Sequence, residues 1–393
     1  MIPVSIYIHI PFCVHRCAYC DFNTYAGMEK WIPSYVDALC KEITLVGNAA
    51  PQMFPVHTIF FGGGTPSFIP AIFIQKILTA IRSQFLILEE AEITLEANPG
   101  SVEPELLETL RLAGVNRLSI GMQSAVQEEL SLLTRTHTPD DVKQSIRFAR
   151  QAGFENINLD LMFGIPGQTM DTWKYSLDFA LSLDPEHLSL YCLTVEEGTP
   201  LHQWVEKGKT IMPSEDETAE MYEFSMDYLA EFGFLQYEIS NWAKPGKNGE
   251  WQMCRHNLQY WNYLPYLGFG AGAHGFFENI RTENVRAIPK YIHQINHLIA
   301  QAFPTSPAND RVLKLDFQEQ MKEYMMVGLR LTHNGVQLED FYSRFGVSLL
   351  EIFKKEINFL LSRDLIEWCN NQRNLRLTRK GKLLGNQVFI HFV

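Results

Sequence analysis

Short apolar runs alternate with longer helical patterns along most of the sequence, and this alternation restricts the fold most. The runs are rich in Ile, Leu and Phe: "SIYIHI", "HTIFF", "EITLEA", "VNRLSIG", "NINLDLMFG" and "HLSLYCLT", with "YEIS" a candidate for a seventh. Runs this continuous are typical of a parallel sheet covered on its outer face. The helical pattern "HTPDDVKQSIRFARQAGF" carries its own boundary signals, because Thr138 can cap a helix, Pro139 suits its first position and Gly153 can end it.

Strands and helices in alternation form either an open doubly wound sheet or a full or partial barrel. Polar residues at the carboxyl ends of the runs distinguish the two: Gly62 to Thr65, Glu96, Gln123, Asp160 and Thr194. A barrel gathers such residues around one mouth, whereas a doubly wound sheet concentrates its ligand at one switch point. We therefore predict an α/β fold, a partial (β/α) barrel of the TIM type.

The pattern changes after about residue 295. The stretch "QAFPTSPAND" is a plausible linker, and three helical patterns follow it near 316–331, 336–345 and 348–362. The runs "LIEW" and "LRLT" then indicate a β-hairpin. We predict a barrel domain over 1–295 and a helical, winged-helix-like domain over 296–393.

Charge and cysteine content argue against several classes of protein. The 33 Lys and Arg residues are outnumbered by 45 Asp and Glu, and the net charge of −12 argues against a general nucleic-acid binder. Seven cysteines, an odd number, argue against a disulfide scaffold and favour a reducing compartment. The N-terminus has no signal-peptide pattern, and no apolar run is long enough to cross a bilayer. We expect a cytoplasmic globular protein.

Three cysteines, Cys13, Cys17 and Cys20, are spaced C-x3-C-x2-C at the end of the first run. Thiolates are soft ligands that select zinc, copper(I) or iron–sulfur clusters. A structural zinc site usually takes four ligands, whereas three thiolates on a four-iron cluster leave one iron open, as in a catalytic centre. The alternatives are three buried cysteines, or a zinc site that His15 completes.

With "GGGTPS" following this loop, the sequence resembles the radical S-adenosylmethionine (SAM) superfamily. The segments "LEANPG", "GMQS", "DLMFGIPGQT" and "LTRKGKLLGN" are similar to the oxygen-independent coproporphyrinogen III oxidase family, most closely to its HemW branch of heme chaperones. The resemblance implies that Cys13, Cys17 and Cys20 bind a [4Fe–4S] cluster whose fourth iron is chelated by the amino and carboxylate groups of SAM. Electron transfer to the sulfonium can then release a 5′-deoxyadenosyl radical.

The resemblance also implies a set of SAM-binding residues. The positions that match are Tyr7, Tyr19, Gly63, Gly64, Thr65, Glu96, Gln123, Arg135 and Asp160. Their chemistry is suitable, because glycines let the backbone approach a ligand, carboxylates bind ribose hydroxyls and Arg135 can bind a carboxylate bidentately. Taken singly, each polar residue could equally be a surface charge, a helix cap or part of an ion pair.

The segment "GFGAGAH", residues 268–274, invites comparison with a dinucleotide-binding fingerprint. It lacks the full G-x-G-x-x-G followed by an acidic residue, and it follows "YLPYL" rather than a clear strand. We do not predict a Rossmann site there.

The segment "CRHNLQYW", residues 254–261, matches an H-N-x-x-Y-W element that the resemblance associates with heme. His256 could ligate heme iron, and Tyr260 and Trp261 could pack on the macrocycle. Further candidates are Arg255 for a propionate, Cys254 as a second axial ligand and, less directly, His274. The alternative is a buried structural network in which neighbours satisfy the histidine.

The resemblance favours a heme chaperone that binds heme and delivers it to hemoproteins. The alternative is a coproporphyrinogen III dehydrogenase that decarboxylates two propionates oxidatively to give protoporphyrinogen IX. Phe22 stands where that branch usually has a fourth cysteine, and the branch's N-terminal extension is missing. A third interpretation, nucleic-acid binding by the basic C-terminal hairpin, conflicts with the acidic charge. The resemblance leaves room for a homodimer and for peripheral membrane contact.

Overall fold

The computed structural model describes residues 3–247, 249–297, 299 and 301–393. By internal contacts the chain divides into two units, Met1–Met221 with Pro265–Leu313 and Tyr222–Leu264 with Lys314–Val393. Residues 222–264 therefore group with the C-terminal residues, which the sequence did not indicate. The domain boundary at residue 295 stays a prediction.

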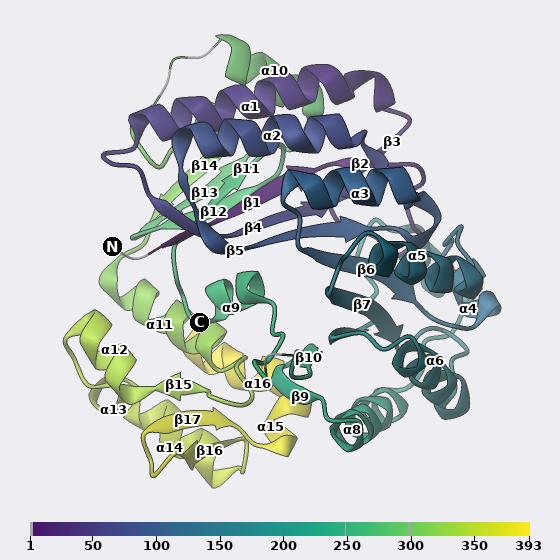
Figure 1. Cartoon of the computed structure of the whole chain (residues 1–393). Coiled ribbons are helices and arrows are strands. Elements are labelled where there is room, and N and C mark those ends of the chain that lie inside the picture. Colours follow the sequence, from purple (N-terminus) through teal and green to yellow (C-terminus); the bar gives the residue numbers. More distant parts are fainter. Residues whose placement is uncertain (1–2, 248, 298, 300) are drawn as a thin grey trace. The chain divides into compact units, whose positions relative to one another are not determined.

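An open, largely parallel sheet forms the centre of the first unit (Figure 1). Its strands are β1 (Val4–Ile10), β4 (Pro55–Gly63), β5 (Leu86–Ala97), β6 (Arg117–Gln123), β7 (Asn156–Phe163), β8 (His187–Cys192), β11 (Tyr266–Phe269), β12 (His274–Phe277), β13 (Ile280–Asn284) and β14 (Asn309–Lys314). Within the unit they follow the order β14-β13-β12-β11-β1-β4-β5-β6-β7-β8. Neighbours from β11 to β8 run parallel, and β12 is antiparallel to β11 and β13.

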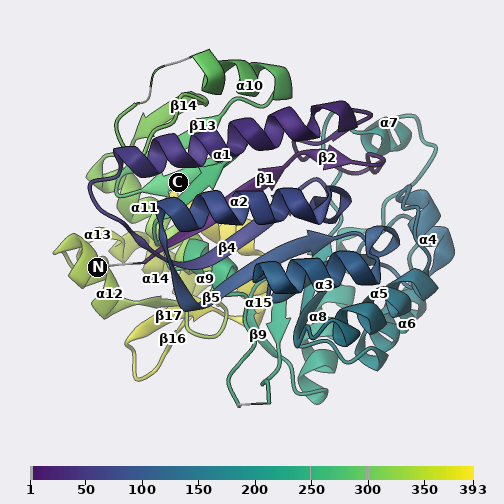
Figure 2. The same ribbon diagram turned by 45° about the horizontal axis from the view of Figure 1, so that its top comes forward.

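Helices cover the outer face of this sheet, and α1, α2 and α3 lie side by side across it (Figures 1 and 2). The helices of the unit, whether or not they lie on this face, are α1 (Ile32–Ala49), α2 (Ala71–Gln84), α3 (Pro104–Ala113), α4 (Gln127–Leu132), α5 (Pro139–Gln151), α6 (Met170–Ser182), α7 (Pro200–Glu206) and α10 (Ile288–His297). The helix α8 (Glu215–Glu231) runs from the first unit into the second. Thr138 caps α5 with a capping box, as the sequence predicts. Fully buried apolar side chains alternate along β1, for example Ile6 and Ile8, as expected for a strand under helices.

The intervening strand positions are also buried, but many are polar. Asn158 of β7 donates to Ser119 of β6 (2.7 Å) and to Asp160 (2.9 Å). Its carbonyl accepts from Ser189 (3.1 Å) and from Nδ1 of His187 (2.6 Å), both on β8. Because successive side chains on a strand face opposite ways, the sheet has an apolar outer face and a hydrogen-bonded inner face.

The predicted partial barrel is confirmed, and all six apolar runs fall in β1 and β4 to β8. "YEIS" overlaps β9 (Leu235–Glu238), which is antiparallel to β10 (Asn241–Ala243), so it adds no parallel strand. The strands from β11 to β14 were not predicted, because they are short and interrupted by glycine or polar residues.

The second unit contains the predicted C-terminal helices and hairpin. Its remaining elements are α9 (Arg255–Trp261), α11 (Phe317–Gly328), β15 (Val336–Gln337), α12 (Leu338–Phe345), α13 (Leu349–Ile352), α14 (Lys354–Ser362), β16 (Ile366–Cys369), β17 (Asn374–Leu377), α15 (Arg379–Leu383) and α16 (Gly385–Phe389). β17 pairs antiparallel with β16 and with β15. Across the described residues, no helix combines the length and apolar character that a membrane span requires.

Candidate functional site

The three cysteines lie in a loop closed at its base by two short parallel strands. β2 (Phe12–Cys13) leads into the loop and pairs with β3 (Tyr25–Ala26), which follows it. The middle of the loop is also fixed, because the Ala18 amide donates to Thr134 Oγ1 (2.8 Å) and the Ala18 carbonyl accepts from the Leu201 amide (2.9 Å). The loop backbone is thus anchored by protein contacts at its base and its middle.

Each cysteine sulfur has a hydrogen-bonding neighbour. Thr65 Oγ1 donates to Cys13 Sγ (3.6 Å), and Arg135 Nη1 donates to Cys17 Sγ (3.5 Å). The Thr24 hydroxyl lies 3.9 Å from Cys20 Sγ. Donors to the sulfurs are among the features that set the reduction potential of an iron–sulfur cluster.

Without a metal, burial favours the neutral thiol form of Cys13 and Cys20. All three cysteines of the loop are free of disulfides. Burial raises the pKa of Cys13 to about 11 and also raises that of Cys20. Iron would replace the proton and stabilise the thiolate that burial disfavours.

Among the residues that the structure describes, no group of three or more His, Cys, Asp or Glu side chains is placed to hold a single metal ion. In a four-iron cluster each thiolate would bind a different iron.

A cavity of about 410 Å³ adjoins the cysteine loop and collects residues from the carboxyl ends of many strands. It is lined by Cys13, Cys17, Tyr19, Cys20, Gly63, Gly64, Thr65, Glu96, Gln123, Arg135, Asp160 and Thr194, among others. The predicted shared mouth therefore exists in the structure. Tyr7 is not among the lining residues; its hydroxyl lies 3.0 Å from Nδ1 of His9.

Gly63 and Gly64, beside the cavity, lie so close to neighbouring atoms that a side chain would not fit. A Cβ on Gly64 would lie 2.6 Å from the Phe12 carbonyl oxygen and 3.0 Å from Cys13 Sγ. Gly63 has a positive φ of 111°, and a Cβ there would meet the ring of His9 at 2.4 Å. The backbone next to the cysteines therefore has no room for larger residues.

Two carboxyl groups line the cavity: Glu96 lies near the end of β5, and Asp160 lies on β7. Burial first, and then the charge of Asp160, raises the pKa of Glu96 to about 8, although the Gly63 amide donates to its Oε2 (3.1 Å). Burial likewise raises the pKa of Asp160, which accepts from Ser119 (2.9 Å). Hydroxyl donors of a ligand would favour the charged forms, so the pair is suited to bind a diol.

The Arg135 guanidinium, which lines the cavity, is held by three acceptors. Arg135 Nη2 donates to Asn98 Oδ1 (2.8 Å) and to the Gly121 carbonyl (2.9 Å), while Nη1 reaches Cys17. Gln123 lies on the same wall with a left-handed φ of 63°, which is uncommon for a residue with a side chain and is frequent at binding sites.

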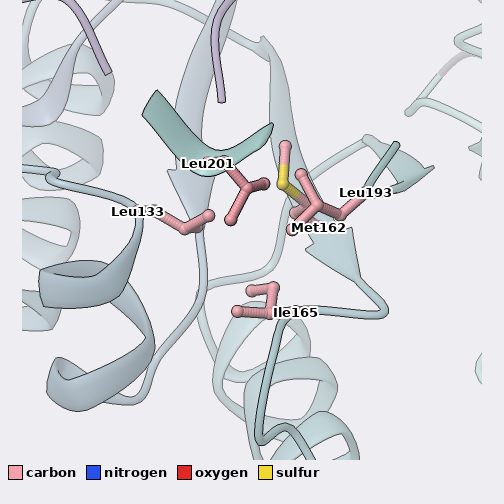
Figure 3. Close-up of a cluster of buried hydrophobic side chains, with 5 residues drawn as sticks. All are labelled: Leu133, Met162, Ile165, Leu193 and Leu201. Carbon is pink, nitrogen blue, oxygen red and sulfur yellow. The ribbon is translucent and has the colours of Figure 1, made fainter. Parts of the chain in front are cut away.

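An apolar cluster supports this end of the cavity (Figure 3). It consists of Leu133, Met162, Ile165, Leu193 and Leu201, which converge from β7, α7 and the loops that follow α4, β7 and β8. Tyr19 packs against it from the cysteine loop. The cluster therefore fixes one side of the loop by burial, in addition to the hydrogen bonds at Ala18.

The high pKa of Glu96 predicts a pH-dependent effect of Glu96→Gln. Ionisation of Glu96 is disfavoured in the folded state, so its contribution to stability is full below pH 4.5 and is lost as the pH rises through about 8. Because Glu96 is only partly buried, we expect the free energy of unfolding of wild type to fall by about 1–2 kcal/mol more than that of Glu96→Gln between pH 5 and 9. Urea titrations of SAM-free protein across this range measure it, and parallel pH profiles would contradict it.

The residues predicted for heme lie in the second unit, on α9. His256 is buried, and its Nε2 lies 2.9 Å from the Tyr260 hydroxyl. The Arg330 guanidinium lies 4.5 Å from the centre of the Trp261 ring. Cys254 is buried before the helix, and Arg255 is exposed. His274 belongs to the first unit, where it is exposed 4.0 Å from Glu283.

Three residues near the cysteines were not predicted: His9, Asn23 and Thr24. His9 and Asn23 join the strand before the loop to the segment after it, since His9 Nε2 donates to the Asn23 carbonyl (3.0 Å). A polar residue inside the apolar run "SIYIHI" is the signal that could have identified His9.

Comparison with known proteins identifies the family. Residues 7–180 match the radical SAM superfamily, and residues 315–384 match the HemN C-terminal domain. Some proteins named heme chaperone HemW are similar along nearly the whole chain. The one from Bacillus subtilis is 41% identical and covers 99% of both chains, and the one from Lactococcus lactis is 36% identical over 100% of this chain and 97% of its own.

Among solved structures, coproporphyrinogen III oxidase (HemN) from Escherichia coli superposes with a TM-score of 0.82. The match covers 100% of this chain and 90% of that one at 22% identity, which supports the fold. The cysteine loop, the cavity and the full-length similarity agree: this chain belongs to the HemW family within the radical SAM superfamily.

Proposed function

We propose that the protein is a heme chaperone that binds heme and passes it to hemoproteins. The observation that carries the proposal is the similarity over nearly the whole chain to proteins named heme chaperone HemW. The matching region includes both the cysteine loop and the α9 segment. Hemoproteins in the cytoplasm are the proposed recipients, and a second copy of the chain and a membrane surface are further candidate partners.

The proposed heme ligand is His256, with Tyr260 and Trp261 beside the macrocycle. The three residues lie on one short helix, and the His256 and Tyr260 rings are 5.1 Å apart at an interplanar angle of 89°. Since His256 Nε2 contacts the Tyr260 hydroxyl, iron would have to replace this contact or bind Nδ1 after a rearrangement. Arg255 is exposed at the start of the helix and would pair with a propionate of heme seated near it.

The cysteines and the cavity are the proposed cluster and SAM sites. Cys13, Cys17 and Cys20 would hold a [4Fe–4S] cluster, which supplies electron transfer to bound SAM. Within the chain, Glu96 and Asp160 would accept hydrogen bonds from the ribose hydroxyls, and Arg135 would orient the methionine carboxylate. Tyr19, Gly63, Gly64, Thr65 and Gln123 would shape the remaining wall, and Tyr7 would act from behind it.

A second candidate is oxidative decarboxylation of coproporphyrinogen III. The complete set of polar cavity residues beside the thiols favours it, because a pure heme carrier would not need them. Anaerobic incubation with coproporphyrinogen III, SAM and a reductant tests it. Protoporphyrinogen IX would support the enzyme, whereas SAM cleavage without this product would eliminate it.

Heme titration tests the chaperone proposal. Cluster-reconstituted wild type should take up heme saturably, at about one heme per chain, and His256→Ala should bind at least about tenfold more weakly because an axial ligand is lost. The measurement is the Soret band under anaerobic conditions. His274→Ala is the control and should bind like wild type. Equal binding by His256→Ala would reject the site, and no saturable binding by wild type would reject the function.

A further inference from the structure

The "GFGAGAH" segment, which resembles a dinucleotide loop in sequence, has a different structural setting. It begins in β11 and turns into the antiparallel strand β12, so it lacks the strand-to-helix turn that a dinucleotide site uses. The turn between the strands, Gly270 to Ala273, contacts the elements around the cysteine loop. The contacts of the Gly270–Ala273 turn therefore relate it to the cysteine loop rather than to a dinucleotide.

Asn23, three residues after Cys20, bonds directly to this turn. Its Nδ2 donates to the Ala271 carbonyl (2.9 Å) and to the Arg286 carbonyl (3.1 Å), which uses both amide hydrogens. Its Oδ1 accepts from the Tyr25 hydroxyl (3.1 Å). The side chain thus attaches the outgoing end of the cysteine loop to backbone atoms 248 and 263 residues further along the chain.

His9 attaches the same residue to the strand before the loop. Because the Asn23 carbonyl can only accept, His9 Nε2 carries the proton, and Nδ1 then accepts from the Tyr7 hydroxyl (3.0 Å). The His9 carbonyl in turn accepts from Tyr35 (2.7 Å), whose oxygen receives the Ala271 amide (2.9 Å). Both ends of the cysteine loop are therefore bonded to one turn.

The glycines of the turn permit this contact. Gly270 has a φ of +103°, and a Cβ there would lie 2.5 Å from the Tyr35 hydroxyl and 2.7 Å from the His9 carbonyl oxygen. Gly272 has a φ of +80°, and a Cβ would lie 2.6 Å from Asn23 Nδ2. Any larger residue would push the turn away from His9 and Asn23.

We propose that Asn23, held by the Gly270–Ala273 turn and by His9, is a positioning residue that sets the cysteine loop in its cluster-binding shape before iron arrives. The inference rests on the assignment of the cluster to Cys13, Cys17 and Cys20, but not on heme binding. Asn23 has no role as a ligand; it acts through the backbone between Cys20 and β3.

The test compares Asn23→Asp, Asn23→Ala and wild type. Asn23→Asp keeps the shape but loses both N–H donors. We expect both variants to fold, to lose reconstituted cluster to a chelator at least about tenfold faster than wild type, and to change the electron paramagnetic resonance spectrum of the reduced cluster. In cluster-free protein, hydrogen exchange of the Tyr25 amide, which donates to the Pro11 carbonyl (2.7 Å), should be faster in both variants.

Glycine variants separate positioning from general backbone strain. Gly272→Ala should reproduce the Asn23 effects. Gly153→Ala, with a similar φ of +85° but no atom within 4 Å of the added Cβ, should keep wild-type cluster retention. The proposal would be overturned if Asn23→Asp matched wild type in cluster retention, in the electron paramagnetic resonance spectrum and in hydrogen exchange of the Tyr25 amide. Failure of wild type itself to bind a cluster would instead reject the cluster assignment, while the exchange measurement still tests the positioning role.

Discussion

Replacement of Cys17 by Ser should abolish the iron–sulfur cluster. A hydroxyl binds iron far more weakly than a thiolate, and the remaining two thiols leave two irons of a cubane without protein ligands. We expect iron and acid-labile sulfide in the reconstituted protein to fall by about tenfold or more, together with the visible absorption of the cluster. The fold should persist, because Cys17 is only partly buried and the loop is anchored at Ala18 and at its base.

The chain offers a matched control for this experiment. Cys192, at the end of β8, lines the same cavity but lies outside the C-x3-C-x2-C motif. Cys192→Ser should therefore retain iron and sulfide at wild-type levels. Loss of the cluster in Cys192→Ser, or its retention in Cys17→Ser, would show that the ligand assignment is wrong.

The largest effect on stability is expected for Glu42→Ala. Glu42 is fully buried in α1, and its carboxyl group accepts four hydrogen bonds. The donors are the amide of Gly270 (2.9 Å), Asn284 (2.8 Å), Tyr291 (2.6 Å) and Ser306 (2.6 Å). Alanine would leave all four donors buried without this acceptor, so we expect the free energy of unfolding to fall by about 3–5 kcal/mol.

Urea unfolding of the purified proteins measures this change. Lys41→Ala is the control, since Lys41 is exposed on the same helix and should change the free energy of unfolding by less than about 0.5 kcal/mol. Glu42→Gln should lie between the two, because its amide nitrogen cannot accept from these donors. Burial raises the pKa of Glu42. The contribution of Glu42 to the free energy of unfolding is therefore greatest at acidic pH and declines as the pH rises through that raised pKa. A loss below about 1 kcal/mol in Glu42→Ala would contradict the structure.

The sequence was sufficient for the barrel and for many residues that line the cavity, although Thr24 and Asn98 line it without having been predicted. Alternating strands and helices restrict the topology, and polar residues at strand ends must meet in a parallel barrel. Glu96 and Asp160 were therefore predictable as neighbours, whereas the pKa of about 8 at Glu96 depends on burial and distance that only the structure gives.

The strands after residue 265 and the Glu42 network were not predicted, for a different reason. β11 is four residues long and ends in a glycine-rich turn, so its periodicity is too short to read. Glu42 lies on the apolar face of α1, with Leu39 and Val46, and this position was a readable signal of a buried carboxylate. Its partners are more than 200 residues away, and no local pattern indicates them.

The polar inner face of the sheet has a consequence for strand alignment. Packing between aliphatic side chains tolerates small shifts, whereas hydrogen bonds between fixed partners do not. Asn158 is tied to Ser119, His187 and Ser189 on the two strands beside β7, so these strands cannot slide past one another without breaking several bonds at once. These hydrogen bonds therefore fix the register of the three strands. The register determines how far the carboxyl end of each strand extends, and so the depth at which Gln123 and Asp160 lie in the cavity.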